Sequence, residues 1–173
     1  VGIAKAITAG GVALAGTNAS DYSVSQPTGL TANVTAKALA VTGLTASDKV
    51  YDGGTAASLS GTASLQGAVG GDAVNLGGTP SASFADETVG ANKAVSVAGY
   101  TIGGADAGNY TLSQPTGLTA SITAKGLTVT GVTASNRVYD ATTSATLNTG
   151  SAALAGIVGG DTVTLGGTAT GSF

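Results

Sequence analysis

The chain has 173 residues, of which 42% are hydrophobic but only 4% aromatic and 9% charged, and its formal net charge is −3. It contains no Cys, His, Met or Trp, which excludes disulfide frameworks, thiolate or imidazole metal sites, and Ser-His-Asp or Cys-His catalysis. Six Lys and Arg are too few and too scattered to follow nucleic-acid phosphates, and no apolar run reaches the ~18 residues of a membrane span.

Strand patterns follow one another along most of the chain. Period-two alternation with abundant Thr and Val is typical of half-buried strands, whereas helical spacing is not sustained over any long window. Gly pairs and a Gln-Pro-Thr-Gly turn separate the segments. The sequence therefore predicts an all-β fold of small immunoglobulin-like sandwiches, with a β-grasp-like unit as the alternative. In chain order, the alternating segments are residues 30–36, 39–41, 74–76, 95–97, 110–112, 118–124 and 127–129.

The chain repeats itself with an offset of 88 residues. Of the 35 residues from 18 to 52, 23 are identical to their counterparts in 106–140. Agreement of this kind indicates tandem copies of one structural unit. We therefore expect the closing part of a repeat over residues 1–36, a complete repeat over 37–124, and the opening part of the next over 125–173. With these bounds the chain begins and stops at the same loop of the repeat.

The joins between copies are expected to be stiff. The segment 118–129 contains no Pro, and as one extended run it would span roughly 40 Å at ~3.3 Å per residue. A β-type connection makes a rod, whereas a Gly/Ser-rich hinge would make a flexible string. The sequence therefore predicts an extended rod with limited bending.

The complete repeat resembles a known family. Its motifs are similar, in the same order, to the YDG-type repeat of bacterial surface proteins, which occurs in tandem in large secreted exoproteins such as those similar to filamentous haemagglutinin and other adhesins. The resemblance covers nearly the whole chain, and it implies an extracellular, repetitive, non-catalytic β module. The segments that carry it are Lys49–Gly53, Gly71–Val74, Ala82–Phe84, Val89–Val95 and Gly104–Leu112.

The Tyr-Asp-Gly triplet is the main candidate motif. We expect Asp52 to accept hydrogen bonds from backbone N–H groups of the following turn, and the ring of Tyr51 to pack at a sheet edge. The second copy has Ala141 in place of Gly53, which favours turn geometry as the role of the third residue. The alternative is a carbohydrate site in which Tyr51 stacks on a sugar and Asp52 accepts its hydroxyls. The candidate structural motif comprises Tyr51, Asp52, Gly53, Tyr139, Asp140, Tyr22 and Tyr110.

Acidic residues gather at turns. Asp72 and Asp161 follow Gly pairs and correspond at an offset of 89, after one inserted residue, while Asp86 and Glu87 share a loop and Asp106 lies in another. Calcium needs 6–8 converging oxygens, and the sequence matches no calcium-binding loop pattern. Turn capping is therefore the expected role of these carboxylates.

Lysines also recur in register, as Lys5 with Lys93 and Lys37 with Lys125. We expect them to be exposed lysines on strand edges, where they discourage strand-to-strand aggregation. An internal Lys–Asn isopeptide cross-link is the alternative, and it would require a buried Lys, an Asn and a catalytic carboxylate.

We expect no enzyme activity and no cofactor, with a cryptic hydrolase as the remotest alternative. The expected function is a structural repeat of a secreted bacterial surface adhesin or extracellular (biofilm) matrix fibre, acting as a stalk or filament module. The alternative is a multivalent module that binds glycan or host protein weakly. Expected partners are neighbouring repeats, including head-to-tail fibre assembly, and neither nucleic acid nor a transmembrane segment is expected. The expected location is the bacterial cell surface or the extracellular space.

Overall fold

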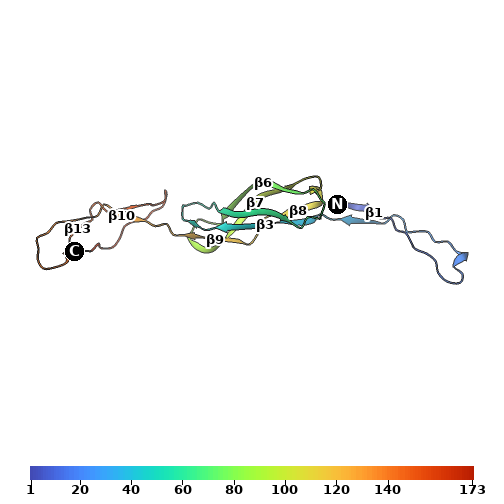
Figure 1. Ribbon diagram of the computed structural model, residues 1–173, viewed down its shortest axis with the longest axis horizontal. Helices are drawn as coiled ribbons and strands as arrows, with labels where there is room; N and C mark the ends of the chain where they lie inside the picture. Colours follow the sequence, from blue (N-terminus) through green and yellow to red (C-terminus); the bar gives the residue numbers. More distant parts are fainter. The chain divides into compact units, whose positions relative to one another are not determined.

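The computed structural model describes all 173 residues as strands joined by turns (Figure 1). The all-β class expected from period-two alternation is confirmed. The chain has no α-helix and only two one-turn 3-10 helices, η1 (Ala19–Asp21) and η2 (Ala107–Asn109), and the choice between an immunoglobulin-like and a β-grasp-like unit stays a prediction. The strands are β1 (Gly2–Ala6), β2 (Thr31–Val34), β3 (Lys37–Ser47), β4 (Lys49–Val50), β5 (Ser58–Gln66), β6 (Asn75–Phe84), β7 (Gly90–Gly103), β8 (Tyr110–Ser113), β9 (Leu118–Thr123), β10 (Thr128–Thr130), β11 (Thr133–Ala134), β12 (Ser144–Ala145), β13 (Leu147–Asn148), β14 (Ala153–Ala155) and β15 (Gly171–Ser172).

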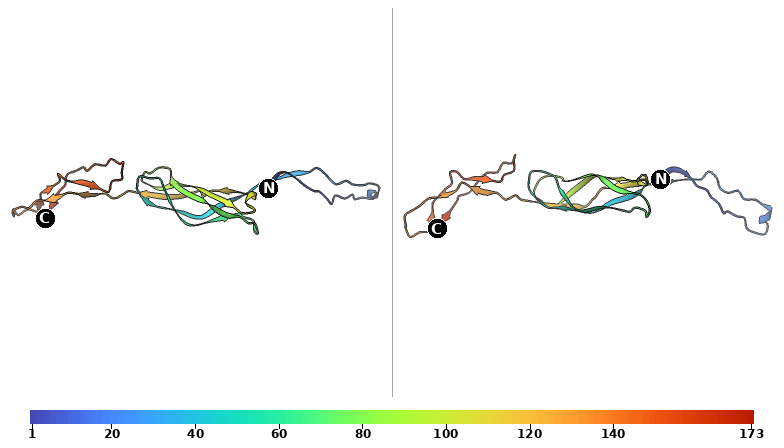
Figure 2. Two further views of the ribbon diagram at one scale, coloured as in Figure 1. Left: turned by 90° about the horizontal axis from the view of Figure 1, so that it is seen from above. Right: turned by 45° about the horizontal axis from the view of Figure 1, so that its top comes forward.

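Two sheets are built from the strands of residues 37–124. One has the order β5-β3-β8, and β3 runs parallel to β8 with Leu39 opposite Leu112. The other has the order β4-β9-β7-β6, in which β9 is parallel to β4 and antiparallel to β7. In both parallel pairs, a strand from the start of the repeat lies beside a strand from its end. The two further views in Figure 2 show these strands without a helix over them.

The chain forms two compact units, each assembled from three segments. The first comprises Val1–Leu44, Gly61–Ser81 and Val97–Thr116, and the second comprises Thr45–Ser60, Ala82–Ser96 and Gly117–Phe173. Strands β3, β5, β6 and β7 contribute to both units, so the units do not follow the expected repeat boundaries, which stay a prediction. The buried side chains of the first unit are Leu39, Val41, Val97, Tyr110 and Pro115, and those of the second are Phe84, Val95, Ala120 and Ile122.

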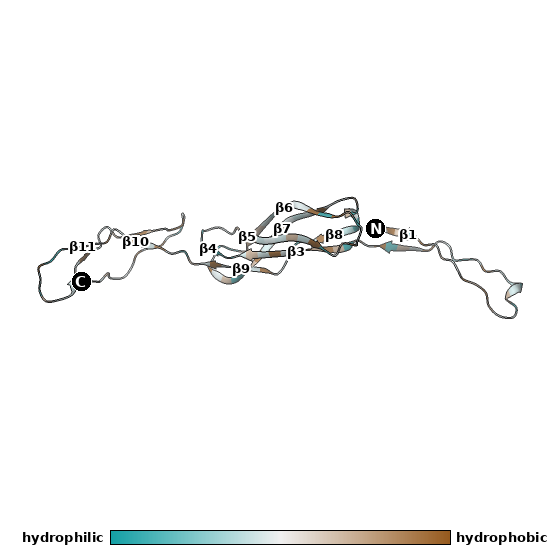
Figure 3. Cartoon of the chain, viewed as in Figure 1, coloured by the Kyte–Doolittle hydropathy of each residue, from teal (hydrophilic) through white to brown (hydrophobic).

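The cores are small because burial alternates along the strands. Leu39 and Val41 are buried on β3 while Ala38 and Ala40 are exposed, as period two requires. Figure 3 shows hydrophobic and hydrophilic residues following one another along the strands. Burying one such aliphatic or aromatic side chain contributes about 1.5–3 kcal/mol, so each of the few core residues carries a large share of the stability.

The duplication in the sequence is reproduced in the backbone. Gly2 pairs with Val34 and Lys5 with Ala32, and 88 residues later Gly90 pairs with Ile122 and Lys93 with Ala120. The irregularity in each pairing contains a non-glycine residue with positive φ, which is 50° at Ala4 and 51° at Asn92. The 3-10 helices η1 and η2 also begin 88 residues apart. The copies therefore share local geometry down to a strained residue.

Backbones approach closely where glycines face each other across paired strands. A Cβ on Gly78, whose φ is +97°, would lie 2.1 Å from the carbonyl oxygen of Gly99. Atoms cannot approach that closely, and φ in this range is unfavourable for other residues. The repeat therefore needs glycine at this crossing of β6 and β7 for two independent reasons.

The join between copies differs from the single extended run that the sequence predicts. Strand β9 ends at Thr123 and β10 begins at Thr128, so the expected run over residues 118–129 is wrong. Pairing with β4 reaches Thr123, whose carbonyl oxygen accepts a hydrogen bond from the Tyr51 N–H at 2.9 Å. The following residues have no neighbouring strand, and a strand without a ladder partner is not maintained.

No helix in the structure is long and apolar enough to cross a membrane.

Candidate functional site at the Tyr51-Asp52-Gly53 turn

Strand β4 places the triplet at the edge of a sheet. Lys49 lies opposite Ile122 and Val50 opposite Thr123, and β4 has no other neighbour in its sheet. Asp48, which precedes β4, stabilises the pairing of β4 with β9, because its carboxylate accepts a hydrogen bond from the Ser121 N–H at 2.6 Å. Tyr51 therefore follows β4 directly at the edge of the sheet, as its sequence predicts.

Asp52 and Lys49 close the turn that follows. The Asp52 carboxylate accepts the Gly54 N–H at 2.9 Å and lies 2.6 Å from the Lys49 ammonium. Lys49 also donates to the Gly54 carbonyl at 2.7 Å and lies 6.0 Å from the ring centroid of Phe84. Lys49, and then the backbone of Gly54, lower the pKa of Asp52 below its ordinary value. The contact expected between Asp52 and the turn backbone is present, and Lys49 links that turn to the buried Phe84.

The second copy forms the same turn with Ala in the third position. Asp140 accepts the Thr142 N–H at 3.0 Å and lies 2.6 Å from Arg137, and Arg137 lies 5.1 Å from the ring of Phe173. Ala141 has φ of +61°, close to the +77° of Gly53. A left-handed conformation costs an Ala roughly 1–2 kcal/mol. The turn is thus retained although its third residue is no longer glycine.

The side chain of Tyr51 contacts residues that follow the expected end of its own repeat. Its hydroxyl donates to Asp161 Oδ1 at 3.1 Å, across 110 residues of sequence. This hydrogen bond, followed by partial desolvation and the charge of Asp161, raises the pKa of Tyr51. Asp161 is itself held by a turn, in which its N–H donates to the Val158 carbonyl at 3.1 Å. The triplet of one copy therefore binds the Gly-Gly-Asp turn of the next.

A small cavity of about 180 Å³ surrounds this contact. A Cβ on Gly53 would lie 2.9 Å from Val158 Cγ1, so glycine permits the approach of the next copy as well as the turn. Most other residues that line the cavity are aliphatic, and the polar groups in its lining are Lys125 and the hydrogen-bonded pair Tyr51 and Asp161. The lining includes Tyr51, Val89, Leu127, Ile157, Val158 and Val163.

Tyr110 makes a related contact inside the repeat. Its hydroxyl donates to Asp72 Oδ2 at 2.5 Å and accepts the Val69 N–H at 3.0 Å, while its ring is buried. The hydrogen bond to Asp72 is the main cause that raises the pKa of Tyr110. Asp72 and Asp161 are counterparts, and each accepts one tyrosine: Asp72 binds Tyr110 of its own copy, and Asp161 binds Tyr51 of the preceding copy.

The structure corrects two expectations about charged residues. Asp86 and Asp106 do accept backbone N–H groups of turns, from Thr88 and Ala73, but Asp72 and Asp161 bind tyrosine hydroxyls instead. The partners that sequence reasoning missed are thus these two carboxylates, Lys49 and Val158. Both copies have Asp at this position of the repeat, and this could have indicated a side-chain partner. A residue needed only for a turn is readily replaced by Asn or Ser.

Lys93 is not the exposed edge lysine that the sequence predicts. Its side chain is largely covered, and its ammonium donates to Asp86 and, at 2.7 Å, to the Thr88 carbonyl. These contacts, with Thr88, lower the pKa of Asp86 to about 2. No Asn is among its hydrogen-bond partners, whereas Lys5, Lys37 and Lys125 are exposed. Lys93 therefore stabilises the loop that contains Asp86 and Thr88, immediately before β7.

The remaining residues of the candidate motif have few contacts. Tyr22 is 74% and Tyr139 is 88% exposed, although their counterparts Tyr110 and Tyr51 both bind an Asp. The structure contains no group of three or more acidic side chains that could hold a metal ion. The motif therefore divides into two engaged tyrosines and two free ones.

Fold and site define an all-β protein of tandem copies, in which a signature turn of one copy holds a turn of the next. The chain belongs to the YDG domain family, whose model matches residues 35–117 and 123–173. The two matches begin 88 residues apart, which is the period of the repeat. No curated protein and no solved structure is significantly similar to the chain.

Proposed function

We propose that the chain is a non-catalytic structural repeat of a secreted bacterial surface adhesin or extracellular matrix fibre, in which immunoglobulin-like sandwich copies form an extended stalk. The observation that carries this proposal is the hydrogen bond from Tyr51 to Asp161. It engages the Tyr51 hydroxyl in holding the next copy, while the Asp52 carboxylate is engaged by Lys49 and by the Gly54 N–H. A motif used in this way serves the connection between copies.

The titratable groups support a structural role. The pKa is shifted at Tyr51, Asp52, Asp86 and Tyr110, and in each case a hydrogen bond within a turn or between turns is the main cause. Perturbed pKa values also mark catalytic sites, but there they belong to groups that converge on one cleft. Here the four groups serve separate contacts along the strands.

The arrangement of the basic residues favours neighbouring repeats, rather than nucleic acid, as partners. Three of the six basic residues, Lys49, Lys93 and Arg137, are paired with an Asp of their own loop. The remaining three are too few to neutralise a series of phosphates. Small side chains, low charge and the absence of Cys suit a long chain that is exported and folds outside the cell, which favours the extracellular location.

The stiffness of the junction can be tested on the full chain, because it contains no Cys of its own. Spin labels on S58C and T170C report the distance between the two sides of the Tyr51–Asp161 contact by electron paramagnetic resonance. A narrow distance distribution is expected, and Tyr51→Ala should broaden it. Tyr139→Ala is the matched control, since Tyr139 is exposed and has no partner. A broad distribution in the parent protein, or equal effects of both variants, would contradict the stalk proposal.

The alternative function is a multivalent module that binds glycan or host protein. The exposed ring of Tyr139 is the feature that favours it, because an uncovered aromatic ring can stack on a sugar. A glycan array and a cell-adhesion assay with the full chain separate the two proposals. Saturable binding that Tyr139→Ala abolishes would overturn the purely structural function.

A further inference from the structure

The two parallel strand pairs of the complete copy join the stretch where the chain enters the copy to the stretch where it leaves. The chain enters at the start of β3 and leaves after the end of β9; β3 is the parallel neighbour of β8, and β4 is that of β9. We propose that these two ladders act as a mechanical clamp, so that the copy bears tension applied along the chain. This inference rests on the proposed structural function and names the load that the stalk carries.

The direction of the strands determines how tension acts on each ladder. Residues before β3 pull that strand toward its own start, whereas residues after β9 pull β8 and β9 toward their own ends. Because each pair is parallel, its two strands are drawn past each other along their axes, and all hydrogen bonds of the ladder are loaded together. In an antiparallel pair the chain would enter and leave at the same edge, and the bonds would open one after another.

Both ladders have the same register. Lys37 lies opposite Tyr110 in the first ladder and Lys49 opposite Ile122 in the second, so that partners are 73 residues apart in each. The entering stretch is therefore not shifted against the leaving stretch between one ladder and the next. Tension along the chain has to move both ladders by the same step before either one fails.

The turn between β8 and β9 is held against extension. The side-chain amide of Gln114 donates to the Tyr100 carbonyl at 2.8 Å, and its oxygen accepts the Tyr100 N–H at 3.0 Å. The same pair of hydrogen bonds joins Gln26 to Val12, 88 residues earlier in the chain. Because both polar groups of the amide are bound to the backbone of β7, the turn resists being drawn out, and β8 and β9 take up tension together.

Side chains add hydrogen bonds to the second ladder, in which β4 has only two residues. The Asp48 carboxylate accepts the Ser121 N–H at 2.6 Å, and the Thr123 hydroxyl donates to the Lys49 carbonyl at 3.2 Å. After β4, the Tyr51 N–H donates to the Thr123 carbonyl at 2.9 Å. The short strand is thus fixed to β9 by bonds beyond those of its own two residues.

Buried side chains protect the ladders from water. Leu39 and Tyr110 belong to the first ladder and Ile122 to the second, and none of the three is more than 7% exposed. Water that reaches a backbone hydrogen bond competes for its donor and acceptor, whereas a bond in a dry interior is electrostatically stronger. The ladders therefore keep their bonds until the core itself opens.

Pulling the same protein in two directions tests the clamp. The chain contains no Cys, so two introduced cysteines on the full chain can carry DNA handles for optical tweezers. T35C with K125C loads the ladders along the strands, whereas T35C with N109C pulls the starts of β3 and β8 apart; all three positions are exposed. The rupture force along the strands should be several-fold higher than the force across them. Forced unfolding reports the unfolding barrier, which depends on how many bonds break in one step.

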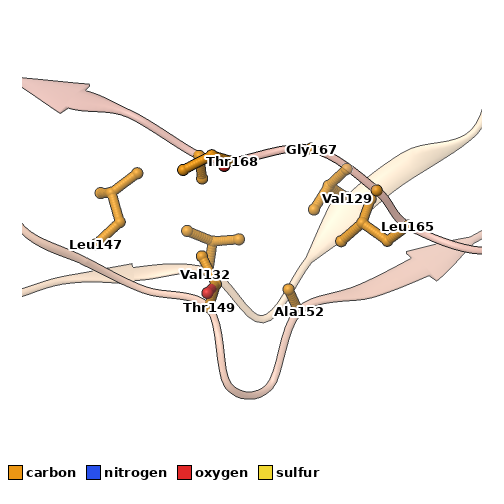
Figure 4. A pocket seen from close by; sticks show the side chains of 10 residues that line it. Val129, Val132, Leu147, Thr149, Ala152, Leu165, Gly167 and Thr168 are labelled. Carbon is orange, nitrogen blue, oxygen red and sulfur yellow. The ribbon is translucent and has the colours of Figure 1, made fainter.

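Asp48→Ala tests the second ladder, because it removes the acceptor of the Ser121 N–H. The variant should lower the rupture force along the strands and leave the force across them unchanged, since pulling across opens the β3–β8 ladder first. Val132→Ala is the control. Val132 lies outside both ladders and lines a cavity of about 740 Å³, which Figure 4 shows between stretches of residues 125–173. Its replacement should change neither force.

Equal forces in the two directions would overturn the inference, as would a weaker force along the strands. An Asp48→Ala variant that lowers both forces alike, or leaves the force along the strands unchanged, would overturn it as well. Equal forces combined with a narrow, Tyr51-dependent distance distribution would refute the clamp and leave the stalk proposal standing. A direction-dependent force combined with a broad distribution would refute the stiff stalk and support the clamp as a property of the single copy.

Discussion

Replacing Phe84 by Ala tests whether one aromatic side chain anchors the core of the second compact unit. Phe84 is 3% exposed, its N–H donates to the Thr55 carbonyl at 2.8 Å, and its ring lies 6.0 Å from the Lys49 ammonium. Truncating a buried Phe costs about 3–5 kcal/mol, which includes the lost transfer free energy and the cavity left behind. Because small domains have a free energy of unfolding of roughly 5–15 kcal/mol, this loss is a large fraction of the total.

The assay is urea unfolding of the full chain, followed by far-ultraviolet circular dichroism in dilute protein. With an m-value of about 1–3 kcal/mol/M, Phe84→Ala should lower the midpoint by roughly 2 M. Phe173→Ala is the matched control. Phe173 lies 5.1 Å from Arg137, in the same relation as Phe84 to Lys49, but it is 71% exposed. Its replacement should cost less than about 1 kcal/mol, as is usual for surface positions.

The comparison isolates burial, because the two phenylalanines share their local sequence contacts and differ in what covers them. Equal midpoint shifts for the two variants would refute the reasoning, since they would mean that the local turn, and not the core, determines the contribution of the ring. A shift close to zero for Phe84→Ala would refute it as well.

Three further predictions follow from the same contacts. Tyr110→Phe should lower the urea midpoint because the hydroxyl has both a donor and an acceptor partner, whereas Tyr22→Phe should leave it unchanged in dilute protein. Gly78→Ala should destabilise the chain by more than the about 1 kcal/mol that follows from φ alone, since the new Cβ meets a backbone carbonyl at 2.1 Å; urea unfolding measures it. The stabilisation from Asp86 should be complete above its ordinary pKa of 3.8 and lost as the pH falls through its folded pKa of about 2, and Lys93→Met should raise that pKa in an NMR titration.

The period-two alternation and the 88-residue offset in the sequence were sufficient to predict the all-β class and the shared geometry of the copies. Alternation at Leu39 and Val41 predicts a strand with one buried face, and the structure buries both residues on β3. The 88-residue offset predicts that the copies share their geometry, down to the pairing of Gly2 and Gly90 with their partners. Such features depend on residues close together in the chain, where periodicity and turn chemistry act directly.

Contacts between distant residues could not be predicted in the same way. Tyr51 meets Asp161, and β3 lies parallel to β8, across separations that no periodic pattern specifies. The extended run over residues 118–129 failed for a related reason, since a good strand sequence ends where its neighbouring strand ends. The recurrence of Lys93 in register with Lys5 predicts an exposed edge lysine, but it carries no information on the partner Asp86, which lies seven residues away on the far side of a loop.

The third residue of the triplet has a consequence for a chain made of many copies. Glycine at position 53 leaves room for a methyl group of Val158 at a point where a Cβ would lie 2.9 Å from it, whereas Ala141 keeps the turn but carries that Cβ. Gly and Ala therefore specify the same local turn but not the same seating of the following copy. A methyl group at position 53 would therefore have to displace Val158, which would loosen the contact between the triplet and the Gly-Gly-Asp turn.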